Sequence, residues 1–442
     1  MLSFFFPLYL VRFDIAGMPL YLIEALVLIA AIPVFYNLIR GEHEVLEKGM
    51  VSKILYLAKS PFLAKKHPVK EFVFSPLFPI TLFVAGALIG AAIVPVDSYK
   101  HALGILKSWV LIPLIYFFIV YRTIRTKSDI QLVIYSYIAS AFLLSIIAVF
   151  QAVSGNYLTI DNRASGPFAS ANYLAMYIAP ALIYTGVRVL QTFLHRPFET
   201  ASTRWNYFER RIYLSGIVSV LFLTLILTQS YGGIIGVFFT FFFYIVYERI
   251  RQRAHKPIRI FLNKVITFIA VIVVLGGALV ATLNIEKFQN LIRPGEHTSL
   301  GTRLEIWEVG GKLLTQNPLL GIGLGEYEAL YKEHAESLLG HVPFESVRLH
   351  SHNMYLETWL NTGLIGIIAF MWILIMAFYH VKKTIPLLQR DERHIMLAIS
   401  MMLIYVMVHG MVDVPFWKND LSLMFWMIIG TLFAVTPHLK QS

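Results

Sequence analysis

The chain of 442 residues contains no cysteine and few charged residues, which make up 14% of the sequence. Without cysteine, disulfide bonds cannot hold any outer loop together. A soluble domain usually carries about 25% charged residues, so this composition is not that of a soluble protein. The sequence also lacks an evident repeat with a period of about 20–50 residues and lacks low-complexity tracts, so a repeat architecture is not indicated.

Long apolar runs are abundant, since 57% of the residues are hydrophobic. A helix that crosses a hydrocarbon core about 30 Å thick needs about 20 such residues. Runs of this length predict about eleven transmembrane helices, at 15–39, 72–94, 102–121, 130–153, 169–190, 211–228, 232–248, 264–283, 358–380, 395–413 and 420–436. The predicted fold is therefore an all-α polytopic membrane protein, with a single integral membrane domain over residues 1–442.

Residues 1–13 are apolar but short, and Pro7 interrupts them. We expect a re-entrant or interfacial segment, or half of a twelfth span. A removable signal peptide is not predicted, because a basic n-region and a small-residue cleavage site are both missing.

The net charge of +11 is unevenly distributed. Lysine and arginine gather in alternate connections between the predicted spans, at 40–70, 122–127, 196–211, 249–264 and 382–393. The positive-inside rule makes these connections cytoplasmic, which places the long segment 284–357 on the outer face. No aromatic and basic binding module accompanies the charge, so a nucleic-acid partner is not predicted.

The outer loop 284–357 is long, polar and flanked by membrane-length apolar runs. A capping-box pattern at Thr302 and Glu305 predicts that a helix starts there, and Asn317-Pro318 predicts its end. Glycines at 321, 323 and 325 predict a turn before a second helix over 326–339. Two amphipathic helices on the membrane surface are therefore expected within this loop.

Three outer segments carry polar side chains suited to chemistry. They are Asp161–Phe168 followed by Asn172, the turn Thr228–Gly233 that holds Tyr231, and a set of loop residues, Arg303, Trp307, Arg348, His350, His352, Asn353 and Tyr355. Arginines and histidines crowded against the start of a span indicate a reaction or binding site rather than a linker.

Structural interpretations of the same residues stay open. The arginines also suit solvated loops or lipid headgroups, and His352-Asn353 also suits a helix cap. A metal site at His350-x-His352 is not predicted, because no carboxylate or thiolate spacing accompanies the histidines. Asp413 shares a helical face with His409, so it either pairs with that histidine or orients a side chain of the site.

In their order along the chain, these motifs resemble those of one family. They are Arg163-x-Ser-Gly-x-Phe168 with Asn172, Thr228-x-Ser-x-Gly232, Arg303 with Trp307 followed by Asn317-Pro-Leu-Leu-Gly-Ile-Gly323, His352-Asn353 followed after nine residues by Gly363-x-x-Gly366, and Asp413. The set is similar to the O-antigen ligase and O-antigen polymerase superfamily of bacterial envelope glycosyltransferases. The resemblance covers roughly residues 150–415.

The resemblance implies a multi-pass enzyme of the bacterial inner membrane with its site on the outer, periplasmic face. The implied donor is a polyprenyl-diphosphate-linked glycan, usually on undecaprenyl diphosphate. The acceptor is a lipid A-core sugar for a ligase or another lipid-linked repeat unit for a polymerase. Nucleotide sugar, cofactor and metal are not required. Membrane lipids are the remaining expected partners.

The family's catalytic positions fall on Arg303 and His352. Binding of the diphosphate or substrate is expected at Arg163, Arg348, Asn353, His350 and Tyr231, with support from Asp413, Trp307 and Tyr355. Many relatives carry arginine where this chain has Tyr231, so Arg163 or Arg348 is expected to supply that contact.

The chemistry agrees with these residue types. Breaking a glycosyl–diphosphate bond releases an anionic leaving group, which arginine can hold with a bidentate fork that stays charged. The acceptor hydroxyl must lose a proton, and histidine, with a reference pKa of about 6.5, can accept it. The sequence thus predicts His352 as general base, with Arg303 and either Arg163 or Arg348 holding the diphosphate.

Alternative functions follow from the same pattern. A polymerase cannot be separated from a ligase or from a related protein O-glycosyltransferase, because no portable motif marks the acceptor. A secondary transporter would place ionisable residues on broken helices near the bilayer midplane, in inverted repeats, and neither feature is evident. A non-catalytic scaffold of an envelope-assembly complex is the weaker alternative, for which Tyr231 is the best argument.

Overall fold

The computed structural model describes residues 1–15, 18–40, 75–159, 161–194, 201–251, 299–345 and 350–436. Most of these residues are helical, and the strands among them form one two-stranded hairpin. Six of the described helices are long and apolar enough to cross a membrane, and four shorter apolar helices accompany them. The predicted all-α polytopic membrane architecture is confirmed.

Ten helices correspond to predicted spans. They are α1 (Leu22–Arg40), α5 (Leu77–Ala92), α7 (Ile112–Thr123), α8 (Lys127–Ser154), α9 (Ala171–Leu194), α10 (Ala201–Leu227), α11 (Tyr231–Arg251), α16 (Met354–Thr384), α17 (Arg390–His409) and α18 (Asn419–Ala434). α7 continues a run that starts with η2 (Val96–Ser98), α6 (Tyr99–Ile105) and the π-helix η3 (Leu106–Leu111), and η4 (Ile385–Leu387) extends α16. The predicted span 264–283 lies outside the described residues.

The N-terminal segment differs from the predicted span 15–39. Strands β1 (Arg12–Ile15) and β2 (Met18–Tyr21) pair antiparallel, and α1 begins only at Leu22. Pro19 lies in β2, where it pairs with Asp14, and α1 begins three residues later. The preceding 3₁₀ helix η1 (Leu2–Leu10) buries Phe6 fully against Tyr116 and Tyr137. At about 2.0 Å rise per residue, η1 is too short to cross a membrane by itself.

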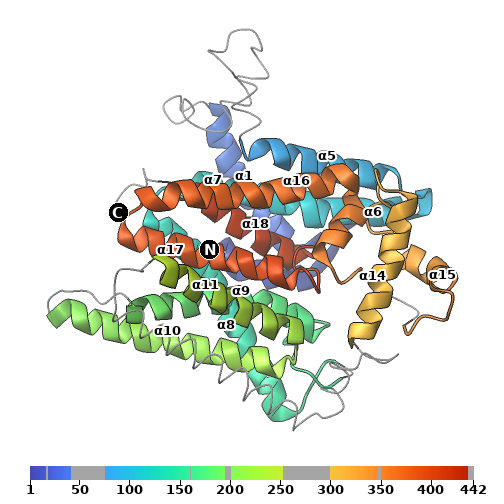
Figure 1. Cartoon of the computed structure of the whole chain (residues 1–442). Helices are drawn as coiled ribbons and strands as arrows, with labels where there is room; N and C mark the ends of the chain where they lie inside the picture. The colour runs from blue at the N-terminus through green and yellow to red at the C-terminus, as the bar shows by residue number, and fades with distance from the viewer. Residues whose placement is uncertain are drawn as a thin grey trace.

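Helix α18 forms the centre of the bundle (Figure 1), and every one of its residues is buried. Its Trp426 packs against the aromatic rings of Phe83 on α5 and Phe117 on α7. A helix that is apolar on all sides and covered by protein is a core element. Among the described elements, η1, η3, α7, α9, α16 and α17 make the main contacts with it.

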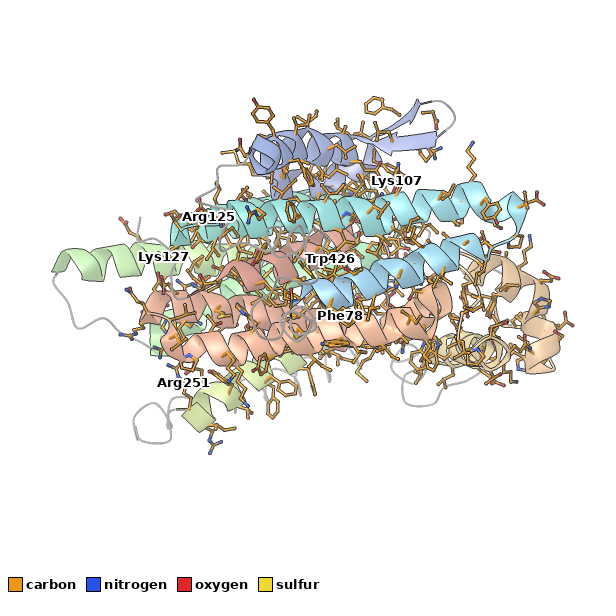
Figure 2. All side chains as sticks on the ribbon, turned by 90° about the horizontal axis from the view of Figure 1, so that it is seen from above. Phe78, Lys107, Arg125, Lys127, Arg251 and Trp426 are labelled. Atoms are coloured by element: carbon orange, nitrogen blue, oxygen red, sulfur yellow. The ribbon has the colours of Figure 1, made fainter. Side chains whose placement is uncertain are left out.

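The two ends of the bundle differ. Figure 1 shows α14 (Ser299–Gln316) and α15 (Tyr327–Leu339) at one end, away from the C-terminus; we call this the loop end. Figure 2 shows Arg125, Lys127 and Arg251 at the opposite end. These three residues, which belong to the basic connections 122–127 and 249–264, therefore lie at the end opposite the α14–α15 segment, as the charge pattern predicts.

A break in α16 holds the α14–α15 turn in place. Gly363 has φ 66° and ψ −172°, which interrupts the helix. The break allows Leu364 N to donate to Leu319 O at 2.9 Å, while Ile322 N donates to Leu360 O at 2.9 Å. Two of the motifs that carry the family resemblance, 317–323 and 363–366, thus bind each other and fix the loop end to the bundle.

Replacement of Gly363 by alanine is expected to destabilise the protein by about 3 kcal/mol or more. The backbone conformation is strained for an L-residue, and an added Cβ would lie 2.5 Å from Leu319 O. Thermal unfolding of the purified protein in detergent measures the loss. Gly340→Ala is the matched control, since Gly340 also has positive φ (80°) but has open space around its Cβ position. Equal unfolding temperatures for the two variants would contradict this role.

Candidate active site

At the loop end, the connection from α17 to α18 meets the start of α16. Met354 N donates to Gly410 O at 2.8 Å, and Asn353 Nδ2 donates to Met411 O at 3.1 Å. Helix α17 stops at His409, four residues before the end of the predicted span 395–413. Gly410 is the C-cap of the helix, and its N–H donates to Val406 O. Asp413 therefore lies in the connection, where its side chain is buried.

His352 stands directly before α16 in the left-handed conformation, with φ 48°. Asn353 caps the helix, because its Oδ1 accepts hydrogen bonds from Tyr355 N and Leu356 N, both at 3.0 Å. The His352 ring turns toward Asp413, and its Nδ1 lies 3.3 Å from Asp413 Oδ1. An ionised carboxylate only accepts hydrogen bonds, so Nδ1 carries the proton and Nε2 keeps its lone pair.

The charge of Asp413 is maintained by its neighbours. Burial alone would raise the pKa of this carboxyl, but the hydrogen bond from His352 and the nearby imidazoles of His352, His350 and His409 lower the pKa well below its usual range. Asp413 also accepts hydrogen bonds from Val414 N at 3.0 Å and Asn172 Nδ2 at 3.4 Å. It is therefore ionised at neutral pH and able to hold His352 in one tautomer.

Arg163 joins the first two predicted segments to this pair. Its Nε donates to Thr228 O at 2.7 Å, and its terminal nitrogens donate to Asn172 Oδ1 at 2.7 Å and to Asp161 Oδ2 at 3.1 Å. Since Asn172 also contacts Asp413, the segment 161–172, the turn after α10 and the α17–α18 connection form one network. The three hydrogen bonds use three of the five N–H groups of the guanidinium.

Arg303 and Trp307 bring α14 to the same place. Arg303 Nε donates to Val412 O at 3.1 Å, next to Asp413 in the chain. One turn further along α14, Trp307 Nε1 donates to His352 O at 3.4 Å. The structure thus brings Arg163, Arg303 and His352 together around Asp413, although they come from distant parts of the sequence.

His350 completes a cluster with its neighbours. Its Nε2 lies 3.3 Å from the hydroxyl of Tyr173, and its ring centroid lies 4.3 Å from that of His352. The candidate metal-ligand atoms of His350, His352 and Asp413 all lie within 4.8 Å of one another. The sequence places no carboxylate at metal-ligand spacing from His350-x-His352. In the folded protein Asp413 brings a carboxylate close to both histidines.

Three further predicted residues have different positions. Tyr231 begins α11, and among the described residues no hydrogen bond joins its side chain to the Asp413 network. The Tyr355 hydroxyl donates to Met407 O at 2.9 Å, so this side chain fastens α16 to α17. Arg348 lies outside the described residues. Asp413 was expected either to pair with His409 or to orient a side chain of the site. Its side chain contacts His352, whereas His409 Nδ1 lies 2.6 Å from the Tyr405 hydroxyl.

The loop helices match the prediction except at the start of α14. That helix begins at Ser299, so Thr302 lies inside it and the predicted capping box is wrong. Glu305 instead accepts a hydrogen bond from Phe344 N at 3.0 Å, which fastens the chain after α15 to α14. The predicted end at Asn317-Pro318, the glycine turn and the second helix are confirmed.

Sequence reasoning missed Glu357, which is buried in the first turn of α16. Its Oε2 accepts a hydrogen bond from Ser351 N at 2.7 Å, and its Oε1 accepts one from Asn361 Nδ2 at 2.9 Å. The Asn361 Oδ1 in turn accepts from Gly325 N at 2.7 Å. Glu357 therefore holds the backbone between His350 and His352. The signal available in the sequence was a carboxylate at the start of an apolar span.

The variant Glu357→Gln is expected to lower activity of the site by about tenfold to a hundredfold, because small misplacements of reacting groups have effects of this size. The amide keeps the volume but weakens the hydrogen bond from Ser351 N. Activity measured beside Glu336→Gln, an exposed glutamate of α15, separates this effect from a general loss of charge. Indistinguishable rates for the two variants would refute the positioning role.

Lys418 is a second residue that sequence reasoning missed. Its Nζ lies 3.8 Å from the ring centroid of Tyr173, with the rings of Tyr9 and Phe168 at 4.6 and 4.8 Å. Asp420 Oδ1 is 3.6 Å away. Burial lowers the pKa of Lys418, and Asp420 opposes this shift. A cation enclosed by aromatic rings thus supports Tyr173, which contacts His350.

Comparison with known proteins finds sequence similarity over part of this region. The family model Wzy_C, described as O-antigen ligase, matches residues 216–371. An uncharacterized protein of Haemophilus influenzae is 26% identical over 333 residues, which cover 71% of this chain and 73% of that protein. The exopolysaccharide production protein ExoQ of Rhizobium meliloti is 28% identical over 121 residues, which cover 27% of this chain and 28% of ExoQ.

The matched region starts in α10 and ends in α16, so it contains Tyr231, Arg303, the glycine turn, His350, His352 and the break at Gly363. Asp413 and Arg163 lie outside it. The resemblance predicted from the motifs is confirmed over residues 216–371, where this multi-pass membrane protein matches the family model described as O-antigen ligase.

Proposed function

We propose that the protein transfers a glycan from a polyprenyl diphosphate donor to an acceptor hydroxyl at the outer face of the bacterial inner membrane, in the manner of an O-antigen ligase. The observation that carries this proposal is the His352–Asp413 pair, which shares a network with Arg163 and Arg303. The network unites a base with two permanent cations at the loop end of the bundle.

The roles follow from the contacts. His352 Nε2 accepts the proton of the acceptor hydroxyl as the new glycosidic bond forms, while Asp413 stabilises the imidazolium. The glycosyl–diphosphate bond breaks, and the bonding electrons leave with the diphosphate. Arg303 and Arg163 stabilise the charge that develops there, and Arg163 has N–H groups beyond those used by its three protein partners.

The position of the site favours this substrate. Arg125, Lys127 and Arg251 lie at the opposite end of the bundle (Figure 2), and clustered basic residues mark the cytoplasmic side. The site would then face the periplasm. The lipid tail of the donor is confined to the bilayer, so its diphosphate lies at the membrane surface. A site at the loop end can reach the diphosphate there without lying deep in the membrane.

A second candidate is polymerisation of an exopolysaccharide. The similarity to a protein named for exopolysaccharide production favours it, although the match spans only 28% of that relative. The proposed chemistry is the same in both cases, since only the acceptor differs. Lipid A-core glycan identifies a ligase, and a second lipid-linked repeat unit identifies a polymerase.

The test uses the full chain in lipid nanodiscs, with a polyprenyl-diphosphate-linked glycan as donor and each acceptor offered separately. We expect transfer to one acceptor, and Arg303→Ala should lower it by about 10²–10³-fold. Arg12→Ala is the matched control, because Arg12 is an exposed arginine paired with Asp14. Solute counterflow in proteoliposomes without any glycan transfer would instead identify a transporter.

A further inference from the structure

The cluster of His350, His352 and Asp413 has a geometry that the proposed reaction uses only in part. His352 Nδ1 and Asp413 Oδ1 are 3.3 Å apart. Two ligand atoms that each lie about 2.0–2.1 Å from a tetrahedral zinc ion are separated by about 3.3–3.4 Å. This pair therefore already has the spacing that a shared ion requires, and the ligand atom of His350 lies within 4.8 Å.

We propose that His350, His352 and Asp413 bind one divalent transition-metal ion of the zinc type, and that the bound ion inhibits the enzyme. Two imidazoles and one carboxylate favour zinc and its neighbours over magnesium or calcium, which prefer oxygen ligands. Three protein ligands leave a fourth position open. Only the inhibitory part rests on the proposed function.

The surroundings of the cluster hold the three ligands in place. The Tyr173 hydroxyl lies 3.3 Å from His350 Nε2, and Asn172 Nδ2 lies 3.4 Å from Asp413 Oδ2. Glu357 fixes the backbone between the two histidines. Partners of this kind orient metal ligands and raise metal affinity, so the cluster is more than a chance approach of three side chains. Partial exposure of both histidines gives an ion a route to the site.

Inhibition follows from the tautomer of His352. Without metal, the N–H of His352 Nδ1 donates a hydrogen bond to Asp413, and Nε2 accepts the proton of the acceptor hydroxyl. A metal ion between Nδ1 and Asp413 takes the Nδ1 lone pair, so the ring proton moves through solvent to Nε2. The imidazole then has no lone pair for the acceptor hydroxyl. No net proton is gained or lost, yet the base is blocked.

The experiment titrates ZnCl₂ into the purified full-length protein in nanodiscs by calorimetry, with MgCl₂ as comparison. We expect one zinc ion per chain with a Kd of about 10 µM or tighter and no saturable binding of magnesium. His350→Ala should weaken zinc binding by about tenfold or more. His334→Ala, which removes an exposed histidine of α15, should bind zinc as wild type does. Undiminished binding in His350→Ala, or no saturable binding in the wild type, would overturn the site.

A second measurement adds ZnCl₂ to the transfer assay and reverses its effect with EDTA. Half-maximal inhibition near the calorimetric Kd supports the blocked-base mechanism. Zinc binding that leaves transfer unchanged would overturn the inhibitory part. If zinc binds but the chain transfers no glycan to any acceptor, the proposed function fails and the metal site stands, so the two failures are distinguishable.

Discussion

Replacement of His352 by alanine is expected to lower glycan transfer by about 10²–10⁴-fold, while folding and membrane insertion are retained. The ring projects from the residue before α16, and its contacts are with Asp413 and the His350 ring, so its loss removes the proposed base without opening the helical core. The initial rate of transfer in nanodiscs measures the effect. Because the side chain acts on the acceptor proton, the loss should appear in kcat more than in KM.

The matched control for this change is His334→Ala. His334 is exposed on α15 and pairs with Glu333, also on the surface. The His334→Ala variant should transfer glycan at the wild-type rate. Both variants should elute from a size-exclusion column as a single species, with unaltered thermal unfolding. A wild-type rate in His352→Ala would remove this residue from the mechanism.

Exchange of Asp413 for asparagine is expected to lower transfer by about 10³–10⁴-fold, the size typical of neutralising a buried carboxylate that fixes a histidine tautomer. An asparagine amide can donate to Nδ1 of His352, which leaves the ring proton on Nε2 and removes the acceptor for the substrate. Asp97→Asn, an exposed aspartate of η2, is the control. The transfer rate of His352→Ala combined with Asp413→Asn should equal that of the slower single variant, because the two residues act as one unit. Multiplicative losses would contradict this.

The pH dependence adds a check on Asp413. Its pKa is depressed in the folded protein, so its stabilising contribution is complete above the unfolded value of about 3.9 and is lost only as pH falls toward the folded value. Stability between pH 5 and 8 should therefore be insensitive to the ionisation of this carboxylate. Thermal unfolding across that range measures it.

The sequence predicted the spans because length and hydropathy alone determine which segments can cross a bilayer. The six long and four shorter apolar helices match ten of the eleven predicted spans, and their ends agree to within about seven residues. The largest differences lie where hydropathy carries no signal. A hairpin takes the place of the first residues of the predicted span 15–39, and η4 extends α16 beyond the predicted end at 380.

The candidate site was predictable in its residue types but not in its contacts. Arg163, Arg303 and His352 stood out because they occur in the motifs that carry the family resemblance. The link between His352 and Asp413 joins residues 61 positions apart, and it depends on how α14, α16 and α17 pack. No periodicity encodes such packing. Glu357 was missed for a related reason: its place at the start of an apolar span was visible, but its hydrogen bonds from Ser351 N and Asn361 Nδ2 were not.

The complete burial of α18 has a consequence for biogenesis. The elements packed against it, among them η1, α7, α9, α16 and α17, all precede it in the chain. During synthesis they leave the ribosome and enter the lipid before the helix that fills their centre exists. Until residues 419–434 arrive, the nascent protein must keep that central space occupied by lipid or by loosely arranged neighbours. Assembly at the loop end, where the chain leading into α18 carries Asp413, is therefore a late event in maturation.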